Sequence, residues 1–165
     1  MASIETRFLK TPLGTLEVQG SDEGILSLAF TETSAEGSFP EPDSYVMRAC
    51  LRQLEDYFEG ALREFDVPLV SSGTPFQQEV WKQVSGIPYG HTRTYGELAR
   101  ALGDPKKVRA VGLANGRNPH LIIVPCHRVV GVNGNLVGYA GGLERKQWLL
   151  HQEQERIAGQ LDLFA

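Results

Sequence analysis

The chain is poor in cysteine, carries no long hydrophobic run and has no overall positive charge. Its two cysteines, Cys50 and Cys126, are too few for the disulfide framework of a small secreted domain, so a reducing environment is expected. No apolar run approaches the roughly 20 residues that cross a bilayer. The first residues lack the basic region and apolar core of a signal peptide. These absences predict a cytoplasmic protein.

The rest of the composition is that of an ordinary globular chain. Of the 165 residues, 41% are hydrophobic and 22% are charged, which excludes a disordered chain, a coiled coil and a collagen-like repeat. The length suits one domain or two small ones. The net charge of −4 argues weakly against a polyanionic partner.

The charge is unevenly distributed along the chain. Residues 1–74 contain 5 Lys and Arg against 13 Asp and Glu, whereas residues 75–165 contain 11 against 7. The excess is concentrated in residues 82–128, where eight cations face two anions. Because phosphate attraction depends on the local field, this segment favours a polyanionic partner. Ordinary variation of surface charge accounts for the same excess. The charge count alone therefore does not distinguish a surface for a polyanionic partner from an ordinary surface, and the motifs have to.

The first half predicts a small α+β unit. Short apolar runs bounded by turns indicate strands, and Pro68 places the last of them at a sheet edge. A helix is expected between a Ser44 N-cap and Gly60. The residues predicted to form strands are 4–9, 16–18, 25–30 and 65–70.

A composition shift near residue 73 divides the chain into residues 1–73 and 74–165. Thr74-Pro75-Phe76-Gln77 opens the second part with the N-cap threonine, N1 proline and N3 glutamine of a strong helix start. A last helix is predicted from Leu143 to about Glu155, followed by a tail.

Two short helices joined by a tight turn are predicted in the basic segment. Thr94-Tyr95-Gly96-Glu97 is a capping box that opens the first, and Asp104-Pro105 caps a second that runs to about Asn115. This is the helix-turn-helix pattern. A generic helix pair with solvated lysines has the same appearance, but the coincidence with the basic segment favours nucleic-acid binding. The cations near the start of the second helix are Lys106, Lys107 and Arg109.

Cys126 is the best candidate for chemistry. It follows a continuous apolar run at residues 121–124, which predicts a buried strand. A free thiol is mostly protonated at neutral pH, and the neighbouring His127 is a base that can activate it directly or through one water. Because neighbours on a strand point to opposite faces, this contact needs a water bridge or a bend after Pro125. A carboxylate should orient the histidine, and spacing leaves three candidates open: Glu153, Glu155 and Asp162.

The second cysteine and the remaining histidines are not expected to take part in catalysis or metal binding. Cys50 lies on the apolar stripe of its helix, so a buried structural cysteine is expected there. A zinc site lacks ligands, because there is no C-x-x-C pair and the histidines other than His127 are scattered.

Residues 123–129, Ile-Val-Pro-Cys-His-Arg-Val, resemble the active-site signature of the O6-alkylguanine-DNA alkyltransferases, also called methylated-DNA–protein-cysteine methyltransferases. Further segments resemble blocks of this family in the right order, over nearly all of residues 73–153. The ordered set is far more specific than the Pro-Cys-His-Arg tetrapeptide, whereas the first half resembles the family only loosely. The further segments are 73–81, 87–98, 109–112, 118–119 and 138–150.

The resemblance implies an α+β fold with a small N-terminal α/β domain of the ribonuclease H-like type and a C-terminal winged helix-turn-helix-type domain that carries the cysteine. It implies DNA repair by direct reversal, in which Cys126 irreversibly takes the alkyl group from O6-alkylguanine, or from O4-alkylthymine, after nucleotide flipping. The implied partner is double-stranded DNA, bound through the minor groove by a monomer that can cluster along DNA. No cofactor is implied, and no metal is expected because the zinc ligands of some animal members are absent.

The resemblance also assigns catalytic roles. His127 would activate Cys126 through a water, and Glu153 would orient His127. Tyr95 would hydrogen-bond the leaving guanine. The residues expected to hold the base, partly through their main chain, are Val129, Tyr139, Ala140 and Asn118.

Arg109 is implied to enter the duplex in place of the flipped nucleotide. The other expected DNA contacts are Lys106, Lys107, Thr94, Asn115 and Arg128. Two alternatives to a repair transferase remain: a non-catalytic damage sensor or helix-turn-helix regulator on the same scaffold, and a Cys–His hydrolase, which would not need the basic helices.

Overall fold

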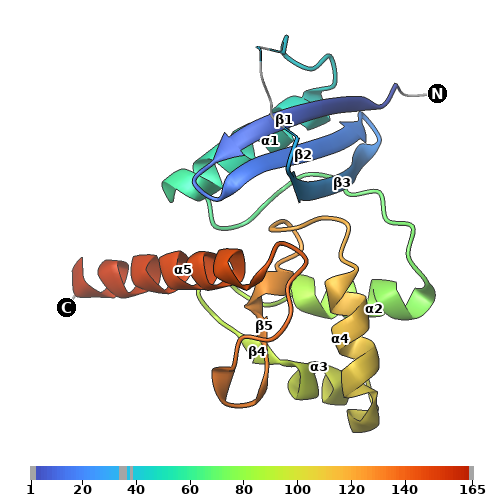
Figure 1. Cartoon of the computed structure of the whole chain (residues 1–165), viewed down its shortest axis with the longest axis vertical. Helices are drawn as coiled ribbons and strands as arrows, with labels where there is room; N and C mark the ends of the chain where they lie inside the picture. The colour runs from blue at the N-terminus through green and yellow to red at the C-terminus, as the bar shows by residue number, and fades with distance from the viewer. Residues whose placement is uncertain (1–2, 34–36, 38, 164–165) are drawn as a thin grey trace. The chain divides into compact units, whose positions relative to one another are not determined.

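The computed structural model describes residues 3–33, 37 and 39–163, and it describes side chains up to residue 159. The chain forms two compact units, Met1–Ser72 and Gly73–Ala165. Figure 1 shows the elements of each unit. In the described part of the chain, no helix combines the length and the apolar character needed to cross a membrane.

The first unit is a three-stranded antiparallel sheet with one helix packed on it (Figure 1). Each strand pairs with the next along the chain, and the helix begins at its N-cap Ser44 and ends at Gly60, which adopts a left-handed conformation. Cys50 lies in the core between helix and sheet, as expected for a structural cysteine. The elements are β1 (Glu5–Thr11), β2 (Gly14–Ser21), β3 (Gly24–Thr31) and α1 (Tyr45–Glu59).

The strand predicted at residues 65–70 does not form, so this prediction was wrong. A single bridge joins Ile25 of β3 to Leu69, with the Ile25 amide donating to the Pro68 carbonyl at 2.8 Å and the Val70 amide donating to the Ile25 carbonyl at 2.9 Å. Pro68 has no N–H to extend the pairing. The segment therefore touches the sheet edge without becoming a fourth strand.

The second unit is mostly helical and carries one short parallel pair of strands (Figure 1). The N-cap Thr74 and Gln77 form the capping box that the sequence predicts. The elements are α2 (Pro75–Ser85), β4 (Arg93–Thr94), α3 (Tyr95–Ala101), η1 (Pro105–Lys107), α4 (Val108–Gly116), η2 (Cys126–Arg128), β5 (Val129–Val130), η3 (Val132–Gly134) and α5 (Leu143–Leu163). The fold is α+β, with the helix-turn-helix pair formed by α3, η1 and α4.

The helix pair is held by local caps and by α2. The Thr94 hydroxyl accepts a hydrogen bond from the Glu97 amide at 3.0 Å, and Asp104 accepts one from the Lys106 amide at 2.9 Å. The indole of Trp81 on α2 donates to the Ala114 carbonyl of α4 at 2.8 Å. These contacts fix α4, the element that leads into the cysteine-bearing segment.

The apolar run at residues 121–124 is buried, but it is a turn and not the predicted strand. Ile122 has a positive φ of 72°, and the Val124 amide donates to the His120 carbonyl at 2.9 Å. An apolar run of this length shows burial without showing backbone conformation. The turn delivers Pro125 and then the short helix η2, so Cys126 starts a helical turn instead of ending a strand.

The last helix is also longer than predicted. α5 continues past Glu155 to Leu163, so residues 156–163 of the predicted tail 156–165 extend the helix, and the last two lie outside the described residues. Ile157 of this extension lies against Gly90, where an added Cβ would approach the Ile157 side chain at 2.5 Å. A glycine at this position therefore allows the end of α5 to pack closely.

Candidate active site

Cys126 lies at the N-terminus of η2 and is 2% exposed. Two asparagines tie its segment to α4 and to the residues that follow it. Asn115 donates from Nδ2 to the Cys126 carbonyl at 3.3 Å, and Asn118 donates from Nδ2 to the Val124 carbonyl at 2.7 Å. The backbone on both sides of the thiol is therefore fixed by one side chain of α4 and by one from the turn that follows it.

Behind the cysteine lies a fully buried group of three charged or titratable side chains. His127 Nε2 is 2.8 Å from Glu153 Oε2. Arg128 donates from Nε to Oε1 and from Nη2 to Oε2 of the same carboxylate, at 2.9 and 3.1 Å. Arg128 also donates from Nη1 to the Ile87 carbonyl at 2.8 Å. One carboxylate on α5 therefore holds both residues that follow the cysteine.

The electrostatics of this group favour an ionised Glu153 and a neutral His127. Burial alone would raise the pKa of Glu153, but the hydrogen bonds of His127 and Arg128, the charge of Arg128 and, at acid pH where it is protonated, the charge of His127 lower the pKa to about 2. Burial lowers the pKa of His127, and the charge of Arg128 acts in the same direction against the pull of Glu153. With its Nε2 proton on Glu153, a neutral His127 has an unprotonated Nδ1. That nitrogen is buried and has no hydrogen-bond partner among the described residues.

The thiol needs this base. Burial raises the pKa of Cys126 to about 11, although a hydrogen bond with Asn118 and the charge of Lys146 each lower it. At neutral pH the group is therefore a thiol, and its nucleophilic form is available only if a neighbour takes the proton.

A cavity of about 250 Å³ opens beside the cysteine. The hydroxyl of Tyr95 donates to the Val137 carbonyl at 2.9 Å, so α3 and the glycine-rich loop close two sides of this cavity. Burial raises the pKa of Tyr95, which keeps its proton at neutral pH and remains a donor. The lining residues are Tyr95, Gly112, Asn115, Gly116, Cys126, Gly138, Tyr139 and Ala140.

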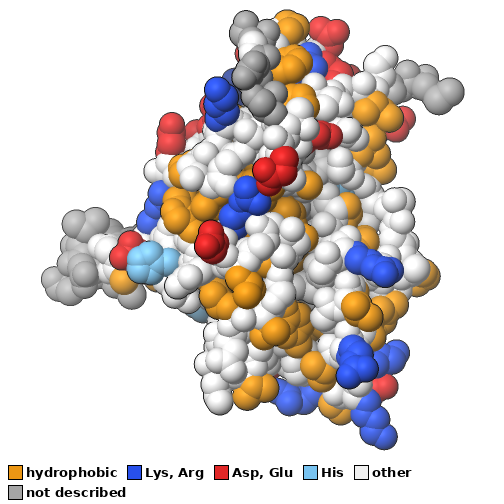
Figure 2. Space-filling view, viewed as in Figure 1, with side chains coloured by type: hydrophobic (Ala, Val, Ile, Leu, Met, Phe, Trp, Pro, Cys, Tyr) orange, Lys and Arg blue, Asp and Glu red, His pale blue; other side chains and the backbone are white. Residues whose placement is uncertain are grey.

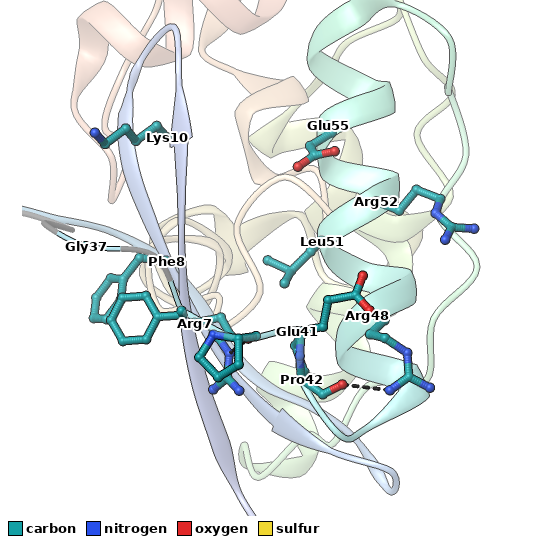
Figure 3. Close-up of a pocket in the computed structure, with 12 residues that line it drawn as sticks. Arg7, Phe8, Lys10, Gly37, Glu41, Pro42, Arg48, Leu51, Arg52 and Glu55 are labelled. Atoms are coloured by element: carbon teal, nitrogen blue, oxygen red, sulfur yellow. Dashed lines mark hydrogen bonds between the residues drawn. The ribbon is translucent and has the colours of Figure 1, made fainter.

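The cavity of the first unit is larger, about 710 Å³, but its lining contains no cysteine or histidine. Figure 3 shows Lys10 and Arg52 on its two sides with their charged ends directed away from each other, while Leu51 and Glu55 point into the space between. Arg48 is occupied by the carbonyls of Pro42 and Asp43. The described residues of its lining carry no thiol, hydroxyl or imidazole group, so the chemistry is assigned to the smaller cavity.

Cations gather over the helix pair. Figure 2 shows lysine and arginine side chains clustered over the ends of α3 and α4 that lie lowest in the view. Lys107 Nζ lies 5.3 Å from the centre of the Phe76 ring of α2. The exposed cations of this region are Arg100, Lys106, Lys107, Arg109 and Arg117.

The structure brings most of the expected site residues together. Cys126, Tyr95, Tyr139 and Ala140 line one cavity, and His127 and Glu153 lie directly behind it. The geometry also selects among the three carboxylates. Glu155 is exposed and pairs with His151 at 3.1 Å, and the side chain of Asp162 lies outside the described residues.

The structure contradicts two of the expected DNA contacts, because both side chains are buried. The guanidinium of Arg128 is turned inward to Glu153 and Ile87, and Asn115 is 4% exposed with its amide on the Cys126 carbonyl. Neither side chain faces solvent, where phosphates bind. Thr94 is half-buried and caps α3, and Val129 is fully buried outside the cavity lining.

Lys146 is a residue that sequence analysis missed. Its side chain is among the largest that are fully buried, and its ammonium group donates to the Val137 and Gly138 carbonyls at 3.1 Å each. A signal was present, since Lys146 shares a helical face at spacings of three and four with Leu149, Leu150 and Glu153. A lysine on the buried face of an amphipathic helix needs polar partners.

Fold and site together define a DNA-binding type of domain that presents a buried cysteine nucleophile backed by a His–Glu pair. Comparison with known families agrees. The family model described as the DNA binding domain of 6-O-methylguanine DNA methyltransferase matches residues 75–155, and the one described as its ribonuclease-like domain matches residues 4–70. The chain belongs to the family of methylated-DNA–protein-cysteine methyltransferases.

Relatives and solved structures cover nearly the whole chain. The methylated-DNA–protein-cysteine methyltransferase of Methanosarcina acetivorans is 50% identical over 149 residues, 87% of this chain and 94% of the relative. That of Mycobacterium bovis is 47% identical over 163 residues, 98% and 99% of the two chains. The crystal structure of Mycobacterium tuberculosis O6-methylguanine methyltransferase has a TM-score of 0.84 at 46% identity and covers 99% of this chain and all of that one. A second Mycobacterium tuberculosis structure, in complex with DNA, has a TM-score of 0.82 at 48% identity, covering 92% and 93%.

Replacing Glu153 by glutamine should destabilise the fold in a pH-dependent way. The folded-state pKa of Glu153 is lowered from 4.5 to about 2, so the ionised carboxylate contributes its full stability above the unfolded value and loses it as the pH falls through the folded value. At pH 7 we expect Glu153→Gln to lower the free energy of unfolding by roughly 3 kcal/mol or more, because Arg128 is left buried without its anion. The deficit should shrink as the pH falls from about 5 toward 2, measured by urea denaturation.

Glu155→Gln is the matched control on the same helix. Its exposed side chain predicts a change in unfolding free energy within about 0.5 kcal/mol. A Glu153→Gln deficit that stays constant with pH would contradict the ionised, buried carboxylate.

Proposed function

We propose that the protein repairs alkylated DNA by moving the alkyl group from O6 of guanine to the sulfur of its own Cys126. As a member of its family the chain is an enzyme of DNA repair that binds DNA and transfers a methyl group to a protein cysteine. The observation that supports Cys126 as the acceptor is its place at a cavity with the His127–Glu153 pair directly behind it. Cys50, the other cysteine, is buried in the core of the first unit.

The first step is removal of the thiol proton. Because the pKa of Cys126 is about 11, the proton must pass to a base as the sulfur attacks. His127 offers Nδ1 as the acceptor, through one bridging water, and Glu153 stabilises the imidazolium that forms. Arg128 keeps Glu153 ionised, so the proton stays on His127.

The second step exchanges one bond for another at the alkyl carbon. The sulfur forms a C–S bond as the C–O6 bond breaks, and the electron pair of that bond leaves with guanine. Tyr95 retains its proton at neutral pH and lines the cavity, so it can donate that proton to the leaving base. The tyrosinate then takes a proton from solvent and His127 releases to solvent the proton that it took from the thiol, so the products are guanine and S-alkylcysteine. A thioether has no easy route back to thiol, so each molecule acts once.

The lesion reaches the cysteine only if the nucleotide leaves the helix. A thiol that is 2% exposed cannot touch O6 of a stacked guanine, so the base is flipped into the cavity. Tyr139, Ala140 and Gly138 on one side and Asn115 on the other form walls for the flipped base. A cavity that fits an alkylated guanine can also admit O4-alkylthymine, which we infer to be a second substrate.

The exposed cations of the helix pair hold the duplex. Lys106 and Lys107 lie in η1, directly before α4, where contacts to phosphates offset the energy of base flipping without reading sequence. Arg109 on α4 is exposed, and we infer that it fills the vacated position. We infer binding through the minor groove, because damage occurs in every sequence context and this groove carries the more degenerate code. One molecule per lesion suits a monomer, and clustering along DNA stays a prediction.

The central experiment exposes the protein to a duplex that contains one O6-methylguanine. Intact mass and peptide mapping should show one added methyl group, located on Cys126. Cys126→Ala should keep duplex affinity and gain no methyl, whereas Cys50→Ala is the matched control and should be methylated like the wild type. An unmodified wild-type protein that still binds the duplex would favour a damage sensor, and turnover of an acyl ester would favour a hydrolase.

Replacing Arg109 by alanine should separate base flipping from chemistry. Because the side chain acts only in the duplex, Arg109→Ala should slow methyl transfer from duplex DNA by on the order of 10-fold or more. Its reaction with free O6-benzylguanine should stay within about twofold of wild type. Equal losses in the two assays would remove Arg109 from the proposed role.

A further inference from the structure

Asn115 is a buried amide at the cavity, and the transfer steps above leave its oxygen atom unexplained. The residue lies on α4, lines the cavity beside Cys126 and is 4% exposed. Its Oδ1 is buried and has no hydrogen-bond partner among the described residues. A buried polar atom without a partner is rare and destabilises the fold that contains it. Such an atom at a cavity points to a ligand that completes its hydrogen bonding.

The nitrogen of the same amide is already in use. Asn115 Nδ2 donates to the Cys126 carbonyl at 3.3 Å. Burial raises the pKa of Tyr95, and a hydrogen bond from Asn115 acts in the opposite direction, as a bond donated to the phenol oxygen does. Exchanging the two ends of the amide would set Oδ1 against the Cys126 carbonyl oxygen, and two acceptors cannot bond. The orientation is therefore fixed, with Nδ2 bound to the protein and Oδ1 available to a ligand.

Oδ1 is the one side-chain carbonyl among the described residues that line the cavity. The other polar side chains of the lining, apart from the Cys126 thiol, are the hydroxyls of Tyr95 and Tyr139. Both keep their protons at neutral pH, because burial raises the pKa of each. The cavity therefore offers hydroxyl groups that can donate and one amide oxygen that can only accept.

The two lesions of the proposed function differ in the hydrogen bonds that they can donate. In O6-alkylguanine the alkyl group leaves N1 without a proton, so the 2-amino group is the one N–H donor of the base. In O4-alkylthymine N3 likewise has no proton, and that base has no N–H donor at all. A site with a buried acceptor favours the base that can donate to it over the base that leaves it unpaired.

We propose that Asn115 is a specificity-determining residue: its Oδ1 accepts a hydrogen bond from the 2-amino group of the flipped O6-alkylguanine, which favours this lesion over O4-alkylthymine. The inference rests on the proposed function, since it concerns the same cavity and the same flipped base. It makes O4-alkylthymine the slower of the two substrates. It also gives α4 a second task, because the helix that carries Arg109 then recognises the base through Asn115.

The test uses two duplexes that differ in a single group. One contains O6-methylguanine, and the other contains O6-methylhypoxanthine, which is the same base without its 2-amino group. Single-turnover methyl transfer from each, at saturating protein, is compared for the wild type and for Asn115→Leu, which has a similar size but no Oδ1. Asn135→Ala is the matched control, because Asn135 is an exposed asparagine outside the cavity lining. Thermal unfolding reports whether each variant is folded.

We expect the wild type to take the methyl group from O6-methylguanine on the order of 10-fold faster than from O6-methylhypoxanthine. In Asn115→Leu the two rates should lie within about twofold of each other, and Asn135→Ala should keep the wild-type ratio. Losing the bond to the Cys126 carbonyl slows Asn115→Leu on both lesions alike, and a difference in base pairing affects both proteins alike. The change in the ratio therefore isolates Oδ1. An O4-methylthymine duplex should gain on O6-methylguanine in the same variant.

A wild-type protein that treats the two purine lesions alike would overturn the proposal, as would an Asn115→Leu variant that keeps the wild-type ratio. If that variant does not fold, Asn115→Ala supplies the same comparison. The affinity of Cys126→Ala for the two duplexes, with and without the Asn115 change, needs no transfer. A wild type that takes no methyl group would refute the proposed function. The Asn115 contact would still stand if Cys126→Ala preferred the O6-methylguanine duplex and lost that preference with Asn115, and would fall if it showed no preference.

Discussion

The buried negative charge of Glu153 is the interaction on which the site depends. An isolated carboxylate in a protein interior is strongly unfavourable, so its two partners are needed for folding as well as for chemistry. Arg128 binds both carboxylate oxygens and anchors itself on the Ile87 carbonyl. Glu153 also pairs with His127 at 2.8 Å and accepts a hydrogen bond from the Gly90 amide at 3.4 Å. The group therefore ties α5, η2 and the turn after α2 together, and in doing so it fixes the base behind the cysteine.

Two walls of different character meet at Cys126. The wall behind it is built from buried, mutually satisfied charges and is rigid for that reason. The wall in front is a glycine-rich loop whose position depends on hydrogen bonds from Tyr95 and Lys146. The amide of Asn115 on α4 bonds to the Cys126 carbonyl. An element of the DNA-binding pair thus contacts the reactive segment directly. A shift of α4 on DNA binding would therefore also shift the backbone that carries the thiol.

Much of this arrangement could be predicted from the sequence, because local signals are strong where caps and glycines define helix ends. The Thr74 and Thr94 caps gave correct helix starts, and Cys50 is buried in the core of the first unit, as expected from its place on the apolar stripe of α1. The run at residues 121–124 was misjudged as a strand, because an apolar run of this length shows that a segment is buried but not whether it forms a strand or a turn. Arg128 was misjudged as a DNA contact for a related reason. Its partner Glu153 lies 25 residues away in the sequence. The residues around the cysteine therefore do not show whether the arginine points to solvent or into the interior.

The tautomer of His127 is the most direct test of the account, because everything assigned to Cys126 requires an unprotonated Nδ1. In protein labelled with ¹⁵N-histidine, long-range ¹H–¹⁵N correlation spectra at pH 7 should show His127 neutral, with its proton on Nε2 and a bare Nδ1. Because burial lowers its pKa, the resonances should not titrate near the ordinary value of 6.5. A proton found on Nδ1, or a titration of His127 at that ordinary value, would contradict the account.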